Sequence, residues 1–465
     1  MVAMTYRVAH LAALSAALFF GMTSIATAQA TTAPAIDLPD LAPILADLET
    51  LRGLSFSHAV PAEVQSLADF DDYLRHSIDQ MYPLDHRDGM MAGLHTLRMI
   101  DVSVDLGDAF RHAAMTQAAA YYDPESDTFY YLMTDGLGSS MAMVAAHELT
   151  HALQDQHFDL TKFLEELMAI GADEVRNDDA ILAARALVEG EATYVHTMWQ
   201  FKQGGVDPVE NIASVRDSIR AQANADLGQI IALSKMAFQA GGGGDNDMVR
   251  AINAMEDIPE YILKPLYAAY MLGAKFVSDL HETGGWNAVN NAYAARPASM
   301  EQVLHPKKYI TDIDRPTPLT LPTFETLDDF TRIDAAIHGE FYLGMWLQAM
   351  GASNLDARRA AAGWDGDIYS AYRNDAGDVI VVLATTWDDD DQAKQFRTTL
   401  ARCLTNDMAL RKAAAEPVGR LSVAGTMSAT LAWTGREVFL VIGNDATLRT
   451  ALTEELLAMT VNHVE

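Results

Sequence analysis

MVAAHELTHALQDQHF, residues 143–158, is the stretch that decides how this chain folds and what chemistry it can carry. It contains the pattern HExxH, and a helical pattern extends over about 141–156. His147 and His151 are four residues apart, so on a helix they lie on one face about one turn apart. Two imidazoles in this arrangement can reach one tetrahedral Zn²⁺, and Glu148 is placed to act as a general base. We therefore expect a buried helix that carries a zinc site.

A catalytic zinc site needs a third protein ligand, and the best candidate lies in ALVEGEATYV, residues 186–195. Glu189 is internal to a second, apolar helix, where an unpaired carboxylate is expensive to bury and a zinc ion is a ready partner. Gly190 beside it costs about 1 kcal/mol relative to Ala in a helix. A close approach of two helices at the metal would explain this glycine. Glu191 is the second choice, about 200° around the same helix.

A different third ligand, His157, would give a metzincin-like site. It lies six residues beyond His151, which is the metzincin spacing, but metzincins have a glycine at the position of Gln154. If the helix continues through Gln154, six residues rotate His157 by ~600° and carry it ~9 Å along the axis, away from the metal. We therefore expect Glu189 to complete the site and keep His157 as the alternative.

Three short motifs together resemble the gluzincin metallopeptidases, in which a glutamate from a second helix completes the HExxH site. HELTH at 147–151 is followed by VEGEA at 188–192, and the segment that begins at Glu189 is similar to the Glu-Gly-x-Ala signature of the aminopeptidase branch. YMLGA at 270–274 is similar to a segment whose tyrosine stabilises the oxyanion in that branch. The resemblance implies a zinc-dependent peptidase that acts on peptides or proteins, with Tyr270 in the oxyanion role.

The chain also departs from this family. It lacks the Gly-x-Met-Glu-Asn exopeptidase signature, so aminopeptidase activity is not implied. Thr193 stands four residues after Glu189, where thermolysin-like members have an aspartate that orients a metal ligand. The residue that holds the imidazoles is therefore unassigned, with Asp155 as a weak candidate. The poor match outside the three motifs keeps a second interpretation open, namely an exported zincin-fold protein that has lost peptidase turnover and acts as a binding or assembly factor.

Patterning along the rest of the chain predicts an α+β fold with two domains. Asp123-Pro124-Glu125-Ser126 is a turn between aromatic strand formers, and the strand 129–133 after it suits the edge strand against which zincins align a peptide. Prolines at 316, 318 and 322 mark a linker. We expect a mainly helical zincin-like domain over 31–315, with a small edge-strand sheet. A smaller α+β domain of strand, helix, hairpin and helix is expected over 316–465.

The composition of the chain excludes some classes of partner and of site. The chain has 465 residues, of which half are hydrophobic, and 64 acidic residues against 32 basic ones give a net charge of −32. Such a field repels phosphate backbones, so we expect no nucleic-acid partner. One cysteine, Cys403, allows neither an internal disulfide nor a CxxC site. The sequence does not indicate an oligomeric state.

The first thirty residues resemble a secretory leader. Arg7 precedes a largely apolar run over 11–22, which is too short to span a bilayer. Small residues then offer cleavage after residue 28 or residue 30. We therefore expect an exported protein, periplasmic or secreted, whose mature chain has no membrane span.

Overall fold

The computed structural model describes most of the chain after the N-terminal segment. Its described residues are 39–132, 141–168, 175–225, 255–407 and 428–459, with short pieces at 227–228, 231, 236, 411–412, 420–424 and 461. The predicted leader lies outside these residues, as does the last residue of the predicted strand 129–133. Among the described residues, no helix is both long and apolar enough to cross a lipid bilayer.

The described chain has a mixed α+β fold, as the sequence predicts, and divides into two compact units. Unit 1 comprises Met1–Tyr82, Gly107–Glu166 and Ala184–Arg296, and unit 2 comprises Pro83–Leu106, Leu167–Ala183 and Pro297–Glu465. This division does not follow a single boundary at residue 315. Two segments from the first half of the chain belong to unit 2, because their contacts are with a sheet formed far along the sequence.

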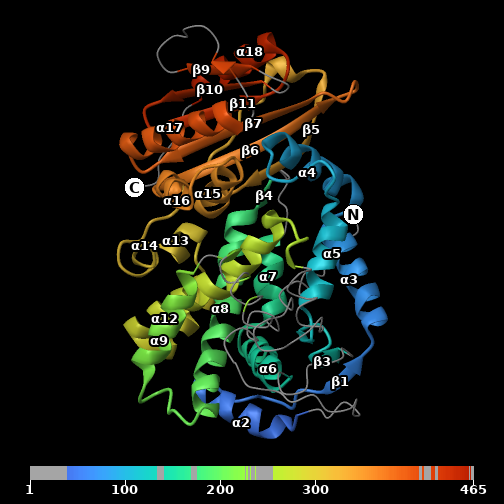
Figure 1. The fold of residues 1–465 in the computed structure, drawn as a ribbon, viewed down its shortest axis with the longest axis vertical. Coiled ribbons are helices and arrows are strands. Elements are labelled where there is room, and N and C mark those ends of the chain that lie inside the picture. The colour runs from blue at the N-terminus through green and yellow to red at the C-terminus, as the bar shows by residue number, and fades with distance from the viewer. Residues whose placement is uncertain are drawn as a thin grey trace. The chain divides into compact units, whose positions relative to one another are not determined.

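Unit 1 is built mainly from helices, which are labelled in Figure 1. They are α2 (Leu41–Arg52), α3 (Leu67–Met81), α5 (Leu106–Gln117), α6 (Met141–Phe158), α7 (Leu160–Met168), α8 (Asp178–Gln203), α9 (Ile212–Ala223) and α12 (Glu260–Ala294). The predicted active-site helix is thus present as α6. Its residues 144–154 are all buried, and they include the polar side chains of His147, Glu148, Thr150, His151 and Gln154.

The sheet of unit 1 has three strands, β1 (Ala62–Gln65), β2 (Ala120–Asp123) and β3 (Thr128–Leu132). The predicted hairpin is confirmed, since β2 and β3 are antiparallel neighbours. The prediction that the strand after the turn lies at an edge is wrong, because β1 pairs with its other side in parallel. The sequence of β1, AEVQ, is short and mostly polar, so its pairing with a strand 67 positions later left no local signal.

Helices α8 and α12 cross at two glycines. A Cβ on Gly190 would lie 2.1 Å from the carbonyl carbon of Gly273, and a Cβ on Gly273 would lie 2.1 Å from the Ala186 carbonyl oxygen. Only residues without a side chain allow this separation. The close approach that Gly190 predicts is therefore present. Near this crossing, Glu189 on α8 lies beside Tyr270 on α12.

Unit 2 contains an eight-stranded sheet in the order β4-β5-β6-β7-β11-β10-β9-β8. Its strands are β4 (Arg176–Asn177), β5 (Phe330–Ile337), β6 (Trp364–Asn374), β7 (Val379–Trp387), β8 (Arg411–Lys412), β9 (Arg420–Ala424), β10 (Ala429–Thr434) and β11 (Glu437–Ile442). Its helices are α4 (Leu84–Leu97), α13 (Met300–Leu304), α14 (Lys307–Ile310), α15 (Gly339–Ala349), α16 (Asn354–Ala361), α17 (Asp390–Asp407) and α18 (Ala446–Leu457), with a 3₁₀ turn η3 (Glu325–Leu327).

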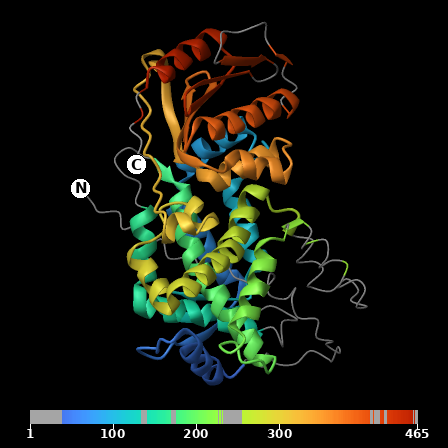
Figure 2. The ribbon, with the colours of Figure 1, turned by 90° about the vertical axis from the view of Figure 1, so that its left-hand side faces the viewer.

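The two faces of this sheet are buried against different helices, which Figure 2 shows on opposite sides of the strands. Along β7, Val381 and Leu383 pack with Phe396 and Leu400 of α17. The alternate residues of β7 pack instead with α18 and with the segment that precedes β5. This period of two is the pattern of a sheet covered on both faces. The predicted strand, helix, hairpin and helix correspond to β7, α17, β10–β11 and α18.

We expect Gly190→Ala to destabilise the protein, because the added methyl group overlaps backbone atoms of α12. Overpacking of this kind costs roughly 1–3 kcal/mol, so the midpoint of thermal unfolding should fall by about 3 °C or more. Gly344→Ala in α15 is the matched control, because its Cβ would meet Ala361 at an ordinary 3.5 Å. Equal midpoints for the two variants would contradict the close crossing.

Candidate metal centre

The structure brings together the three predicted ligands from two helices. His147 and His151 on α6 lie with their Nε2 atoms 3.2 Å apart. Glu189 on α8 places its Oε2 atom 3.3 Å from each of these nitrogens. All three side chains are buried, with exposed fractions of 0%, 3% and 1% in this order. The three ligands come together because the histidines lie one helical turn apart and the carboxylate is buried on a neighbouring helix.

The three atoms form a nearly equilateral triangle that fits a metal ion. Ligands about 2.0–2.1 Å from a tetrahedral ion lie about 3.3–3.4 Å from one another, which is close to the spacings found here. Oε1 of Glu189 is buried and has no hydrogen-bond partner among the described residues. The His147–His151–Glu189 group, which we call the ligand triad, can therefore hold a metal ion.

The pKa values of the three side chains in the ligand triad show how strongly they interact with one another. Burial alone would raise the pKa of Glu189, but its bonds and charge interactions with the two histidines lower that pKa to about 2. Burial would lower the pKa of His151, yet the nearby carboxylates, Glu189 foremost, raise it to about 9. Burial lowers the pKa of His147 to about 4. The two histidines thus favour the ionised form of Glu189, and Glu189 in turn favours the charged form of the His151 imidazole.

Glu148, the predicted general base, is also buried beside the ligand triad. Its Oε2 atom accepts a hydrogen bond of 3.2 Å from the backbone N–H of Tyr122 on β2. Its Oε1 atom is buried and has no partner among the described residues. Burial raises the pKa of this carboxyl to about 8, and the charge of Glu189 adds to the shift. One oxygen of Glu148 is thus fixed by the backbone and the other is available for a proton.

Tyr270 lies next to the ligand triad, on α12. The centroid of its ring is 5.5 Å from that of His147. Burial, followed by the negative charges of Glu189 and Glu148, raises the pKa of its hydroxyl well above the usual value, and a hydrogen bond to Glu189 contributes. The structure therefore places Tyr270 at the site with its hydroxyl on a predicted ligand. Its action on an oxyanion stays a prediction.

His157 does not join the ligand triad. Helix α6 continues through Gln154 and ends at Phe158, so no turn brings the last histidine back. Its Nε2 atom lies instead 2.9 Å from the backbone oxygen of Ser55. The metzincin-like arrangement is therefore not formed, and the reason is the absence of the glycine that would end the helix.

The partner of His151 is Gln154, which sequence analysis missed. The Nδ1 atom of His151 lies 2.8 Å from Oε1 of Gln154. Asp155, the weak candidate, does not contact the imidazoles in this way; it accepts hydrogen bonds from the Tyr122 hydroxyl and the Leu160 backbone N–H. The spacing of three residues between His151 and Gln154 was the available signal, because such pairs lie on one face of a helix.

Glu191, the second choice for a ligand, points to other partners. It forms a buried ion pair with Arg52 of α2 and accepts a hydrogen bond of 2.6 Å from the Tyr293 hydroxyl. Its position about 200° around α8 from Glu189 explains why the two carboxylates serve different contacts.

A second acidic cluster, in unit 2, already contains a cation. Glu301, Asp314 and Asp388 surround the ammonium group of Lys308, whose Nζ atom lies 2.6, 2.7 and 2.9 Å from their oxygens, respectively. Burial raises the pKa of Glu301 to about 9, although Lys308 opposes the shift. The cluster is thus a buried ion network and does not require a metal.

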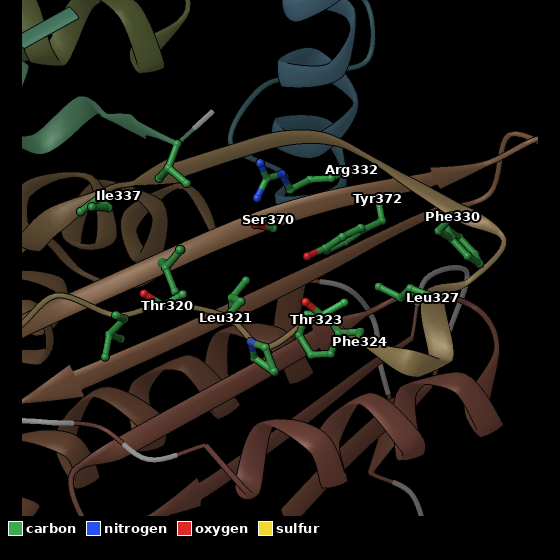
Figure 3. Close-up of a pocket in the computed structure, with 14 residues that line it drawn as sticks. Thr320, Leu321, Thr323, Phe324, Leu327, Phe330, Arg332, Ile337, Ser370 and Tyr372 are labelled. Atoms are coloured by element: carbon green, nitrogen blue, oxygen red, sulfur yellow. The ribbon is translucent and has the colours of Figure 1, made fainter. Parts of the chain in front are cut away.

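Unit 2 also contains a pocket of about 610 Å³, within the range of small-molecule sites. One wall is a face of β5 and β6, and the other is the extended segment 319–324. Figure 3 shows Arg332 and Tyr372 on the sheet side and Thr320 and Leu321 on the other. None of the fourteen described residues that line it is a histidine, cysteine or carboxylate. The described lining therefore offers no histidine, cysteine or carboxylate ligand for a metal ion.

Comparisons with known proteins leave the family of the whole chain open. A family model described as "Domain of unknown function (DUF8575)" matches residues 325–453, all in unit 2. No curated protein matches the chain. A solved structure from Chloroflexus aurantiacus, described as "a putative hydrolase with a novel fold", is 17% identical and covers 59% of this chain and 88% of that chain, with a TM-score of 0.35. A score of this size does not establish a shared fold.

The ligand triad predicts one tightly bound metal ion per chain. Glu189→Ala removes one of three ligands and should weaken metal binding by about 100-fold or more, measured by metal analysis after dialysis and by competition with a chelator. His157→Ala is the matched control, since this histidine is on the same helix but outside the triad. Full metal retention by Glu189→Ala, or loss in His157→Ala, would contradict the assignment of ligands.

Metal affinity should increase with pH, because the ion must displace the proton on His151. The pKa of this imidazole is raised to about 9 in the metal-free site, so each pH unit gained below that value should tighten binding about tenfold. Chelator competition at several values between pH 6 and pH 8 measures this slope. An affinity independent of pH over this range would show that the triad holds no proton to displace.

Proposed function

We propose that this protein is a zinc-dependent hydrolase that cleaves peptide bonds, with a site of the gluzincin type. One observation carries the proposal: two imidazoles one helical turn apart and a carboxylate from a second helix converge within 3.3 Å in a buried place. The HExxH pattern supplies the glutamate that this chemistry needs next to the first ligand.

The donor set supports zinc as the ion. Two imidazole nitrogens and one carboxylate oxygen are the protein ligands of many catalytic zinc sites, which keep a fourth position for water or substrate. Magnesium and calcium prefer oxygen ligands in larger number, and a square-planar copper site needs four donors in one plane. Zinc held by His147, His151 and Glu189 would supply Lewis acidity, which acidifies a water molecule and polarises a carbonyl group.

Glu148 is the residue that we propose to move the proton. Its Oε2 atom is held by the Tyr122 N–H, so the carboxylate cannot rotate freely, and its Oε1 atom is available as the acceptor. With a dication in the triad, the carboxyl has a positive charge nearby and is expected to be ionised and able to act as a base. Oε1 would take the proton from the attacking water and return it to the departing amine nitrogen.

Tyr270 is the proposed donor to the oxyanion. Its hydroxyl is anchored by Glu189 in the absence of substrate, and burial keeps it protonated. A hydroxyl that exchanges this bond for one to the developing oxyanion would stabilise the transition state by about 3 kcal/mol. Arg185, one helical turn before Glu189, contributes positive charge near the same hydroxyl.

The proposal also includes the export of the protein and the class of its substrate. The N-terminal sequence supports a leader, and the net charge of −32 disfavours nucleic acid as a partner. We therefore propose a periplasmic or secreted enzyme that acts on peptides or proteins.

Burial of the site favours one other function. His147 and Glu148 are 0% exposed, Tyr270 is 1% exposed, and β3 has no free edge for a peptide to pair with. These features suit an exported zincin-fold protein whose zinc is structural and which acts as a binding or assembly factor. A peptidase would have to open this site to its substrate.

Glu148→Gln separates the two functions. The substitution keeps the size of the side chain but removes the base, so peptide hydrolysis should fall by 10²-fold or more while metal content stays at one ion per chain. Cleavage of a broad peptide library is the measurement, and Glu63→Gln, an exposed change on β1, is the control. Equal turnover in the variant and the wild type would contradict the mechanism. A wild type that holds zinc at full occupancy but cleaves nothing would favour the binding factor.

A further inference from the structure

His151 is contacted on both of its ring nitrogens. Its Nε2 atom faces the other members of the ligand triad, at 3.2 Å from His147 and 3.3 Å from Glu189. Its Nδ1 atom faces Oε1 of Gln154 at 2.8 Å. A histidine that binds a metal through one nitrogen commonly donates a hydrogen bond from the other, which fixes both the tautomer and the ring orientation.

The orientation of the Gln154 amide decides which nitrogen of His151 carries the proton. Nε2 of Gln154 lies 2.9 Å from the backbone oxygen of Val188, and this carbonyl can only accept a hydrogen bond. The NH₂ group must therefore face Val188, so the amide oxygen must face His151. An oxygen can only accept in that contact, and Nδ1 of His151 must be the donor. The Nε2 lone pair is then directed toward the triad.

Three further residues connect Gln154 to a buried ion pair. The NH₂ group of Gln154 also donates to the Tyr293 hydroxyl at 2.9 Å. Tyr293 in turn donates to the Glu191 carboxylate at 2.6 Å, and the guanidinium of Arg52 neutralises that carboxylate. Arg52, Gln154 and Glu191 are each at most 1% exposed, and Tyr293 is 8% exposed. The series of donors thus ends at the Glu191 carboxylate, which forms an ion pair with Arg52.

The backbone and the aromatic packing hold these residues in place. Gly284 and Gly285 interrupt α12, and the φ of +61° at Gly285 is a conformation that other residues rarely adopt. The helix that follows carries Tyr293, whose ring stacks on Phe158 at a centroid distance of 4.0 Å and an angle of 4°. The Arg52 guanidinium lies 4.4 Å from the ring centroid of Trp286, just after the interruption. The residues of these contacts come from helices α2, α6, α8 and α12 of unit 1.

We propose that Gln154, Tyr293, Glu191 and Arg52, the Gln154 network, are positioning residues that set the tautomer and the ring orientation of His151 for metal binding. The proposal rests on the metal site of the proposed function but not on peptidase activity. Glu191 acts here as a fixed anion that polarises Tyr293 and Gln154 toward His151. Because none of the four is a member of the triad, their loss should weaken metal binding without removing a ligand.

The test is metal affinity in full-length variants. Gln154→Leu removes the acceptor for His151, and Tyr293→Phe separates Gln154 from Glu191 while keeping the ring stacked on Phe158. Loss of such a partner typically weakens metal binding 10–100-fold, and we expect this range for Gln154→Leu and a smaller loss for Tyr293→Phe. Tyr267→Phe on the same helix is the control, because that hydroxyl donates to the Gln222 backbone oxygen. Zinc affinity is measured by chelator competition, and thermal unfolding verifies the fold.

A spectroscopic readout distinguishes positioning from a general loss of structure. In the zinc-loaded wild type, ¹⁵N NMR of the imidazoles should show a proton on Nδ1 of His151, and Gln154→Leu should move the shift of this nitrogen because its hydrogen-bond acceptor is lost. In the Co²⁺-loaded protein, the visible absorption bands of the two variants should differ from those of the wild type and of Tyr267→Phe.

The outcomes separate this inference from the proposed function. A wild type that binds zinc, together with Gln154→Leu and Tyr293→Phe variants that bind it equally tightly, would overturn the Gln154 network and leave the metal site standing. A wild type that binds no zinc would overturn both. Weaker binding in both variants with an unchanged Tyr267→Phe supports the inference.

Discussion

Two imidazole nitrogens and a carboxylate oxygen lie within 3.3 Å of one another in a buried part of unit 1, and such a group favours a cation. The two imidazoles lower the pKa of Glu189, and Glu189 raises the pKa of His151, so positive charge at this place is favourable. A metal ion would supply this charge and would have three good ligands. The surrounding helices are arranged so that this one contact can form.

The requirement for close contact explains the packing of the helices. Glu189 can reach the histidines of α6 from a neighbouring helix only if α8 is held tightly in the interior, and the crossing of Gly190 with Gly273 on α12 provides this. The same crossing brings Tyr270 to the carboxylate. The interruption at Gly285 then redirects the end of α12 toward α6. Glycines therefore determine the site although none of them contributes a ligand.

Local patterns predicted the parts of the site that depend on short spacing. The four-residue interval between His147 and His151 fixes a shared helix face wherever the helix lies, and a carboxylate within an apolar helix indicates a buried partner for Glu189. Contacts between distant segments had no such signal. Tyr293 is 139 positions from Gln154, and Arg52 is 139 positions from Glu191. The strand β6 contains Asp365-Gly366-Asp367, which is typical of turns, and only its pairing with β5 and β7 makes it a strand.

The central claim is that His147, His151 and Glu189 bind one zinc ion together. X-ray absorption spectroscopy of the zinc-loaded protein, combined with anomalous diffraction at the zinc edge, tests it most directly. The account predicts a single anomalous peak about 2.0–2.1 Å from Nε2 of both histidines and from Oε2 of Glu189. A zinc peak beyond bonding distance of Glu189, or one bound by other residues, would contradict it.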